Sequence, residues 1–373
     1  MLNDLIAKFA TRLFFDLIDI RLIFAIKYMI MQYRQLGKSG LLVSELCLGT
    51  MSFGGHGYWE KIGGLEQNTA QRLVDVALDA GVNFFDTANV YSHGQSEEIL
   101  GKTFKGKRDK VVVATKVRGR MSPEINDVGL SRRHILQSCE RSLRRLGTDY
   151  IDIYIVHSFD FMTPLEETLS ALNDLVHQGK VRYLGCSNYF AWQLMKALSI
   201  SEKHNWEKFV SLQAYYSLVA RDVEYELVPL CEDQGLGLTP WSPLAGGFLT
   251  GKYPRGGKGP KDARRSKEEQ NFLQFDENRA YKILDEVKRI ADARGVTPAQ
   301  VSLNYLLRKP AVSSVIIGAT KIEQLQDNLK SVTWQLSADE VRALDAVSEL
   351  PRLYPKWMLE STRLDRDNPN IFL

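Results

Sequence analysis

Eight short apolar segments alternate with longer helix-like segments from about residue 46 onward, and this alternation limits the possible folds more than any other feature. The apolar segments are rich in β-branched residues and span residues 46–50, 83–87, 111–117, 151–157, 181–186, 209–214, 236–241 and 312–317. Strands that lack polar alternation are buried on both faces, as in a parallel sheet. We therefore expect eight parallel strands connected by helices.

The segments between these strands carry helix signals. Residues 73–80 and 165–176 place apolar side chains at the spacing of a helix with one buried face. Thr163 and Thr297 each precede a proline, which predicts a threonine N-cap with proline at the first helical position. Ser337 is followed three residues later by a glutamate, which predicts a capping box.

Eight strands with intervening helices over roughly 250 residues favour a (β/α)8 barrel. The alternative is an open, doubly wound sheet, which usually carries a GxGxxG turn after its first strand. Residues 51–57 follow the first strand here and do not fit that spacing. We therefore predict an α/β fold of the TIM-barrel class. A hairpin that turns at residues 37–40 precedes the barrel, and two extra helices cover residues 279–293 and 338–348.

The predicted barrel domain covers residues 31–350, and a tail of residues 351–373 follows it. Residues 1–30 form a separate N-terminal extension. The extension is apolar, but its charged residues argue against a membrane span. Three interpretations stay open for it: an amphipathic surface helix, a poorly ordered segment, or a start assigned too early, because Met31 reads as the natural beginning of a domain.

The composition argues against several functional classes. A formal net charge of +3 is small for 373 residues, whereas a dedicated nucleic-acid binder needs a strong basic stripe. The four cysteines include no CxxC pair and the six histidines no HxH or HExxH spacing, so no metal site is expected. Reduced cysteines fit a cytoplasmic protein. The long polar stretch 252–274 indicates a lid or binding loop.

Polar residues that can transfer protons stand at the ends of three successive predicted strands. Asp86 lies at the end of the second strand and Tyr91 follows that strand. Lys116 lies at the end of the third strand, and His157 ends the fourth. The carboxyl ends of parallel strands meet at one rim of the sheet, where α/β folds carry their chemistry. We expect these four side chains to converge there.

The four residue types suit proton donation to an oxygen atom. A free phenol has a pKa of about 10, so Tyr91 needs assistance to act as an acid at neutral pH. The ammonium group of Lys116 stabilises a phenolate and lowers that pKa, Asp86 holds the ammonium in place, and His157 orients a carbonyl oxygen. No serine or cysteine nucleophile stands beside a base, and no facing pair of carboxylates suggests glycoside hydrolysis.

Several motifs occur in an order that resembles the aldo-keto reductase family. They lie at residues 81–91, 96–101, 114–116, 156–157, 179–188, 241–247 and 317–321. The resemblance runs from about residue 31 to about residue 348 and implies a (β/α)8 barrel that binds a nicotinamide cofactor without a Rossmann fold. It also implies that Asp86, Tyr91, Lys116 and His157 form the catalytic tetrad, with Tyr91 as the proton donor.

The same resemblance implies a set of cofactor-binding residues. They are Thr50, Met51, Asp86, Ser187, Asn188, Gln213, Trp241, Ser242, Pro243, Leu244, Gly246, Lys252, Gly318, Thr320, Gln324 and Asn328. Tyr216 matches a position that packs beside the nicotinamide ring. NADPH is expected rather than NADH, because Lys321 with Arg264 or Arg265 can bind a 2′-phosphate through charge-assisted hydrogen bonds.

The resemblance is greatest to the branch of microbial aryl-alcohol dehydrogenases and potassium-channel beta subunits. It implies reversible reduction of an aldehyde or ketone to an alcohol. The alternative is an NADP(H)-binding regulatory subunit with little turnover, like the channel subunits. Those subunits commonly lack histidine at the fourth tetrad position, so His157 favours an enzyme.

The sequence does not identify the natural carbonyl compound. Phe53, Tyr58 and Trp59 either line an aromatic substrate pocket or pack their own loop. The expected partner is a small-molecule carbonyl or alcohol, with no nucleic acid and no membrane span. The oligomeric state stays open.

Overall fold

The computed structural model describes residues 31–55, 59, 62–257, 259–261, 265 and 273–367. The extension 1–30 lies outside the described residues, so all three interpretations of it stay untested.

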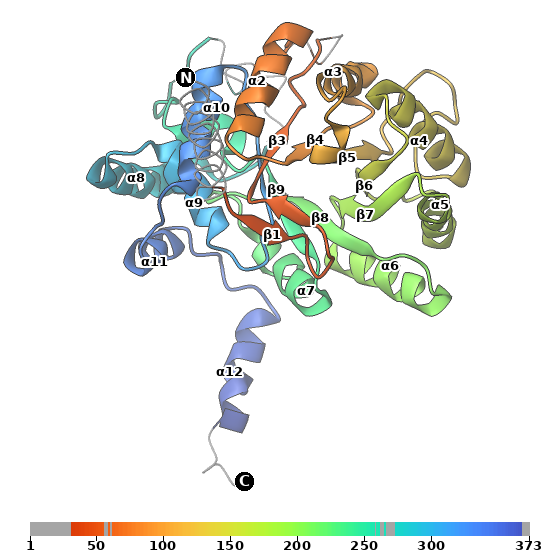
Figure 1. Cartoon of the computed structure of the whole chain (residues 1–373). Coiled ribbons are helices and arrows are strands. Elements are labelled where there is room, and N and C mark those ends of the chain that lie inside the picture. Colours follow the sequence, from red (N-terminus) through yellow and green to blue (C-terminus); the bar gives the residue numbers. More distant parts are fainter. Residues whose placement is uncertain are drawn as a thin grey trace, which may run out of the picture.

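Eight parallel strands form the centre of the molecule (Figure 1). They are β3 (Leu46–Gly49), β4 (Phe84–Asp86), β5 (Val112–Val117), β6 (Ile151–Val156), β7 (Val181–Ser187), β8 (Phe209–Tyr215), β9 (Gly237–Trp241) and β10 (Val315–Ile317). Their order in the sheet is β10-β3-β4-β5-β6-β7-β8-β9. A parallel bridge between Leu238 and Val312 links β9 to the segment before β10 and brings the two edges together.

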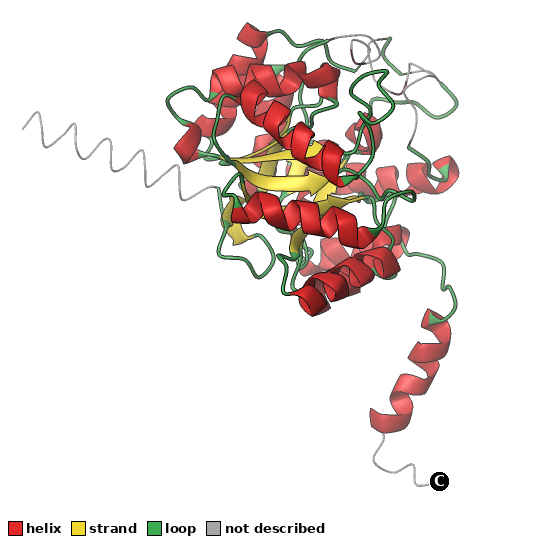
Figure 2. Ribbon diagram, turned by 90° about the vertical axis from the view of Figure 1, so that its right-hand side faces the viewer, coloured by secondary structure: helices red, strands yellow, loops and turns green. Residues whose placement is uncertain are grey.

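Helices surround the strands on the outside (Figures 1 and 2). They are α2 (Gln67–Asp79), α3 (Gln95–Thr103), α4 (Arg132–Leu146), α5 (Leu165–His177), α6 (Ala191–His204), α7 (Leu227–Gln234), α8 (Glu277–Arg294), α9 (Pro298–Leu307), α10 (Ile322–Leu329), α11 (Ala338–Val347) and α12 (Lys356–Asp367). Strands and helices alternate along the chain from β3 to α10, except that both α8 and α9 lie between β9 and β10. This order confirms the predicted (β/α)8 barrel.

The predicted N-terminal hairpin is also confirmed. Strands β1 (Tyr33–Gln35) and β2 (Leu42–Ser44) pair in antiparallel register. Leu36 and Val43 of the hairpin are fully buried against the inner side chains of the barrel. Gly37 has a φ of 62°, and a Cβ atom there would lie 2.5 Å from the carbonyl oxygen of Gly235. Only glycine therefore allows the hairpin to close this end of the barrel.

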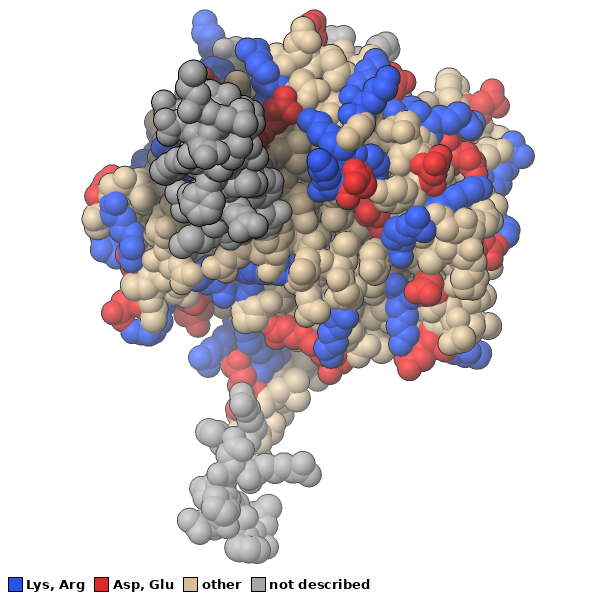
Figure 3. Space-filling model, in the orientation of Figure 1, with Lys and Arg blue, Asp and Glu red and all other residues tan. Residues whose placement is uncertain are grey.

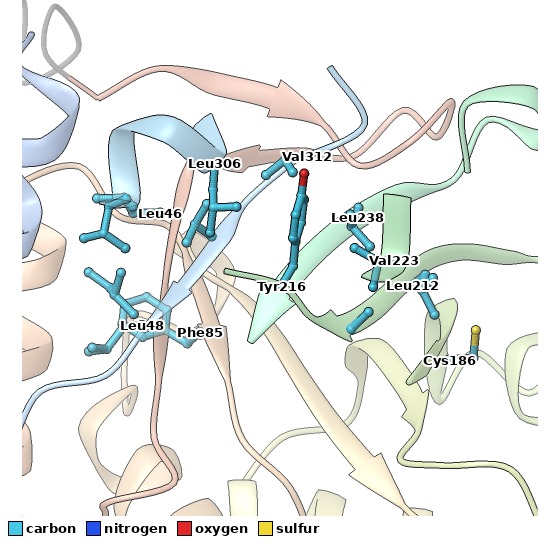
Figure 4. Packing of buried hydrophobic residues seen from close by; sticks show 14 of the residues in the cluster. Leu46, Leu48, Phe85, Cys186, Leu212, Tyr216, Val223, Leu238, Leu306 and Val312 are labelled. Atoms are coloured by element: carbon cyan, nitrogen blue, oxygen red, sulfur yellow. The ribbon is translucent and has the colours of Figure 1, made fainter. Parts of the chain in front are cut away.

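Side chains alternate between the inside and the outside of the barrel, as the two-residue period of a strand requires. Phe84 belongs to the inner cluster, whereas its neighbour Phe85 packs between the strands and the helices. Figure 4 shows part of this outer layer, including Leu48, Phe85 and Tyr216. Asp86 and Lys116 each lie two residues after an inward-facing apolar residue of the same strand, so they also face the inside of the barrel.

The two extra helices occur where they were predicted, as α8 and α11. Arg294 of α8 donates to Glu340 of α11 at 2.5 and 2.6 Å, which joins the two helices. Ser337 and Glu340 form the predicted capping box. Thr297 accepts from the backbone N–H of Gln300, as expected for the N-cap of α9.

One predicted cap is wrong. Helix α5 begins at Leu165, and Pro164 rather than Thr163 occupies the N-cap position. The Thr163 hydroxyl instead donates to the Asp160 carboxylate at 2.8 Å. This local hydrogen bond competes with capping and shifts the start of the helix by one residue.

The predicted tail contains a helix that the sequence analysis did not identify. Helix α12 extends away from the barrel (Figures 1 and 2). Trp357, Met358 and Leu359 on this helix are exposed. Tyr354 packs near Trp357, with ring centroids 6.1 Å apart.

Candidate active site

The four predicted catalytic side chains meet at the carboxyl end of the barrel. Asp86 is the last residue of β4, Lys116 lies one residue before the end of β5, and His157 directly follows β6. Tyr91 begins the short 3-10 helix η2 (Tyr91–Gly94) after β4. The parallel pairing of β4, β5 and β6 therefore brings the four groups to one rim.

The ammonium group of Lys116 is the centre of the cluster and is fully buried. It donates to Asp86 Oδ1 at 2.5 Å, to the carbonyl of Thr87 at 2.8 Å and to the hydroxyl of Tyr91 at 3.3 Å. Burial alone lowers the pKa of Lys116, but Asp86 and Tyr91 outweigh burial, so the pKa is raised. Lys116 is therefore a cation in contact with the phenol.

Tyr91 lies between two other rings and is only 8% exposed. Its ring centroid is 5.3 Å from that of Trp59 and 5.8 Å from that of His157, and both contacts are edge-to-face. The Lys116 ammonium also lies 4.9 Å from the Tyr91 ring centroid. These contacts fix the phenol in one orientation.

His157 is a neutral imidazole at physiological pH. Burial, followed by the positive charges of Lys116 and Arg118, lowers the pKa of His157 to about 3. The Asn188 side-chain amide donates to the backbone carbonyl of His157 at 2.9 Å. A neutral imidazole still offers one N–H donor at the rim.

A buried ion pair outside the barrel supports β5. Glu97 of α3 is fully buried, accepts from Thr115 Oγ1 at 2.5 Å and pairs with Arg145 of α4 at 2.6 Å. Thr115 immediately precedes Lys116, so this network holds the strand that carries the ammonium. It gives a physical reason for the glutamate in the motif at residues 96–101.

Thr50 supports the site from behind. Its hydroxyl is fully buried, donates to the backbone carbonyl of Asp86 at 3.0 Å and lies 2.8 Å from the hydroxyl of Ser96. The Thr50 hydroxyl therefore has protein partners, and the role of Thr50 in cofactor binding stays a prediction. The neighbouring Met51 is partly exposed.

Three polar residues predicted to bind the nicotinamide lie next to the tetrad. Ser187 and Gln213 are register partners at the ends of β7 and β8, and Asn188 follows Ser187. Gln213 Nε2 donates to Asp86 Oδ2 at 2.8 Å, a contact that the sequence did not predict. Among the described residues, nothing donates to the amide oxygens of Gln213 and Asn188. Two unoccupied acceptors of this kind suit the amide group of a nicotinamide.

The aromatic residue beside this site is Tyr215, not Tyr216. Tyr216 is fully buried in the outer layer, where its hydroxyl donates to Glu224 at 2.5 Å. Tyr215 lies two residues after Gln213 and therefore on the same inner face of β8. Its ring stacks on Trp241 at the end of β9, with centroids 5.0 Å apart.

The loop after β9 is built around glycines. Ser242, Pro243 and Leu244 lead into the 3-10 helix η5 (Ala245–Thr250), in which Gly246 and Gly247 have φ values of 66° and 87°. Such values favour glycine. Lys252 lies close to Gly247, because a Cβ atom there would be 2.8 Å from Nζ. The ammonium group also lies over the Tyr253 ring.

Arg265 packs over the same loop. It pairs with Glu277 at 3.0 Å, and its guanidinium lies 4.5 Å from the centroid of the Phe275 ring. Its Nη1 is buried and has no hydrogen-bond partner. Arg264, the alternative candidate for the 2′-phosphate, lies outside the described residues, as does Tyr58 of the aromatic loop.

The residues expected at the adenosine end surround the start of α10. Gly318 and Thr320 are exposed after β10, and Thr320 donates through its N–H to the Gln324 side chain at 3.1 Å. Lys321 is the N-cap residue of α10, and Asn328 is buried. An anion near the start of this helix is stabilised by backbone N–H groups that have no partner within the helix.

Arg118 is a residue of the rim that the sequence analysis missed. It directly follows β5, two residues after Lys116, and its φ is 133° although it is not glycine. Its position at the end of a strand is the one feature of the sequence that could have indicated it.

Other kinds of site find no support in the described part of the chain. There, no group of three or more His, Cys, Asp or Glu side chains could hold a metal ion. Of the helices described, none has the length and apolarity to cross a membrane. Figure 3 shows Lys and Arg interspersed with Asp and Glu on the face in view, without a broad basic stripe.

A parallel barrel with a cluster of ionisable groups at its carboxyl rim has the architecture of a TIM-barrel enzyme. The family model described as the aldo/keto reductase family matches residues 45–349. The chain therefore belongs to the aldo/keto reductase family.

Named relatives cover most of the chain. A protein of Schizosaccharomyces pombe whose name includes aryl-alcohol dehydrogenase is 38% identical over 84% of this chain and 94% of its own length. The versiconal hemiacetal acetate reductase of Aspergillus parasiticus is 36% identical over 84% of this chain and 96% of its own length. An Arabidopsis thaliana protein named for a voltage-gated potassium channel subunit beta is 40% identical over 81% of this chain and 91% of its own length. The branch expected from the sequence is confirmed.

Proposed function

We propose that the protein is an NADPH-dependent reductase that converts an aldehyde or ketone into an alcohol, with Tyr91 as the proton donor. The observation that carries this proposal is the contact of Tyr91 with a fully buried ammonium group, that of Lys116, at 3.3 Å. As the phenol gives up its proton, the negative charge that remains is stabilised by that cation.

The other tetrad members prepare this transfer. Asp86 binds the Lys116 ammonium at 2.5 Å and prevents the buried cation from losing its proton. His157 donates its N–H to the carbonyl oxygen of the substrate, and its neutral form avoids a second cation beside Lys116. The edge-to-face rings of Trp59 and Tyr91 would form one aromatic side of the pocket that holds the carbonyl carbon of the substrate.

A bound nicotinamide cofactor supplies the hydride. Ser187, Asn188 and Gln213 would hold its carboxamide, and the unoccupied amide oxygens of Asn188 and Gln213 support that assignment. The remaining candidates are Met51, Trp241, Ser242, Pro243, Leu244, Gly246, Lys252, Gly318, Thr320, Gln324 and Asn328. They would line the rest of the site.

NADPH is proposed over NADH because cations stand near the start of α10 and the loop after β9. Lys321 is exposed at the N-cap of α10, and Arg265 has a buried Nη1 without a partner. Fluorescence titration should give tighter binding of NADPH, and Lys321→Gln should weaken NADPH more than NADH. Equal affinities in the wild-type protein would count against the 2′-phosphate assignment.

The alternative is a regulatory subunit that binds the cofactor with little turnover. The similarity to the protein named for a potassium channel subunit supports this alternative. A panel of aldehydes, ketones and sugars, followed by NADPH absorbance, separates the two functions. Turnover that disappears in Tyr91→Phe supports the reductase, whereas cofactor binding without turnover of any carbonyl compound supports the regulatory role.

The cytoplasm is the proposed location. The thiols of Cys47, Cys139, Cys186 and Cys231 are all free and buried. Reduced thiols of this kind persist in the reducing cytoplasm. Fractionation of cells that express the full chain tests this assignment.

A further inference from the structure

Arg118 occupies a strained position at the rim of the barrel. Its φ of 133° lies in a region that favours glycine, yet the residue is arginine. The backbone N–H of Gly129 donates to its carbonyl at 3.0 Å and helps to hold this conformation. Strained residues persist only where the surrounding structure enforces them, and they gather at functional sites.

The loop that begins at Arg118 lies between the segments that carry Tyr91 and His157. On one side, a Cβ atom at Gly119 would lie 2.9 Å from Val90, the residue before Tyr91. On the other side, a Cβ atom at Gly129 would lie 2.8 Å from Asp160, three residues after His157. The charge of Arg118 also reaches His157, since it contributes to the lowered pKa of that imidazole.

The guanidinium group of Arg118 lacks a hydrogen-bonded carboxylate in the described part of the chain. Among the described residues it forms no ion pair, and its Nε is buried without a hydrogen-bond partner. The charge of Arg118 helps to lower the pKa of Asp160. The Asp160 carboxylate does not accept a hydrogen bond from Arg118, however, but from Leu130, Met162 and Thr163. The positive charge of Lys116, by contrast, is matched by Asp86.

Two structural arginines in the described part of the chain are paired with carboxylates. Arg145 binds Glu97, and Arg221 binds Glu224 and the hydroxyl of Ser348. Arg118 differs from them because it forms no ion pair in that part of the chain and its buried Nε has no hydrogen-bond partner there. Arg308 shares this state but interacts electrostatically with Glu45, whereas Arg118 lies beside the tetrad. A guanidinium in this state matches the two oxygens of a carboxylate or a phosphate.

We propose that Arg118 binds an anionic group of the substrate, so that the preferred substrates are carbonyl compounds that also carry a carboxylate or phosphate. This inference rests on the proposed reductase function and specifies its substrate class. Arg118 is a specificity-determining residue, since it binds a part of the substrate that does not react.

The test compares 2-, 3- and 4-formylbenzoate with their neutral methyl esters, and 4-formylphenyl phosphate as the phosphate arm. In the wild-type enzyme, kcat/KM should favour at least one anionic aldehyde over its ester. Arg118→Gln should lower kcat/KM for that anion by about 10- to 100-fold, the range of a hydrogen bond to a charged group, and leave the ester within about 3-fold. Arg118→Lys should recover part of the loss.

Arg120 provides a matched control on the same loop. It is exposed and donates to the carbonyls of Ser122 and Glu124. Arg120→Gln removes one positive charge two residues away and should keep the preference of the wild-type enzyme. A loss of preference in both variants would mean that the net charge of the loop acts at long range, which overturns specific binding by Arg118.

The failure of this inference can be distinguished from the failure of the proposed function. If neutral and anionic aldehydes all remain unreduced with either cofactor, the reductase proposal fails. Calorimetric titration of the wild-type protein and of Arg118→Gln with benzoate and with inorganic phosphate still tests Arg118. If esters are reduced as well as acids and Arg118→Gln lowers both equally, or if benzoate and phosphate bind equally to both proteins, the inference is overturned.

Discussion

The two ends of the barrel interior are both buried, but their residues differ in kind. Toward the amino ends of the strands the inner side chains are apolar, as at Phe84 of β4 and Ala114 of β5. Two residues later on the same strands, Asp86 and Lys116 form an ion pair in which neither side chain is more than 4% exposed. The change from apolar to ionic takes place within about 7 Å along a strand.

This contrast separates stability from chemistry. The apolar end gains free energy from burial and is closed by the hairpin, so no ligand can enter there. At the polar end, burial of charge is costly unless every charge is paired. The arrangement persists there because Asp86, Thr87 and Tyr91 all accept from Lys116. Substitutions at the two ends should therefore change different properties.

The largest expected effect is on catalysis at the polar end. Tyr91→Phe removes the proton donor and keeps the ring, so kcat should fall by about 10²- to 10⁴-fold, the usual contribution of general acid catalysis. Cofactor affinity and the unfolding midpoint should stay close to the wild-type values. Steady-state kinetics with NADPH, together with fluorescence titration, measure both quantities. Near wild-type turnover would remove Tyr91 from the role of acid.

The opposite pattern is expected at the apolar end. Phe84 is about 1% exposed, and Phe84→Ala should lower the free energy of unfolding by about 3–5 kcal/mol through lost burial and a cavity. The kcat of the protein that remains folded should change little. Urea denaturation and active-site titration test this, and a loss of kcat comparable to that of Tyr91→Phe would break the separation of the two ends.

A smaller effect is expected at Gln213, which connects the ion pair to the opposite side of the barrel. Gln213→Met removes the hydrogen bond to Asp86 and should lower the free energy of unfolding by about 1.5–3 kcal/mol, the range for a hydrogen bond to a charged group. Gln324→Met is the control, because Gln324 bonds only to Thr320 in the described structure. Equal stability of the two variants would show that Gln213 does not support Asp86.

The smallest effect is a difference in pH dependence at His157. In the folded state the pKa of His157 is lowered to about 3, whereas the ordinary value is 6.5, so the unfolded chain binds a proton first as the pH falls. The stability that His157 contributes is present above about pH 6.5 and is lost toward pH 3. His157→Gln should therefore lose less stability than the wild-type protein between pH 7 and pH 5. Urea midpoints at both pH values measure this, and identical losses would contradict a neutral His157.

Much of the fold was predictable because each strand and helix carries its own local signal. The apolar segments coincide with β3–β10, and the capping box at Ser337 marks the start of α11. Thr163 does not cap α5 because its hydroxyl donates to Asp160, a contact that helix propensity alone does not reveal. Helix α12 was not predicted because an exposed helix has no buried apolar face that the sequence pattern could show.

The site was predictable only in part. The convergence of the four predicted catalytic residues follows from their positions at or after strand ends, since parallel pairing brings such positions together. The sequence could not distinguish Tyr215 from Tyr216, because a one-residue change of register reverses the face of the strand. Nor could it identify the strained backbone of Arg118 or the contact between Gln213 and Asp86, which depend on packing between distant segments.

The most direct test of the central claim is the pH dependence of kcat/KM for carbonyl reduction in Lys116→Met. If Lys116 stabilises the Tyr91 phenolate, removal of the cation makes the phenol harder to deprotonate. The decline of kcat/KM at alkaline pH, where the donor has lost its proton, should then move to higher pH than in the wild-type enzyme, and Lys116→Arg should restore part of the difference. A decline at the same pH in the wild-type enzyme and in Lys116→Met would contradict the account.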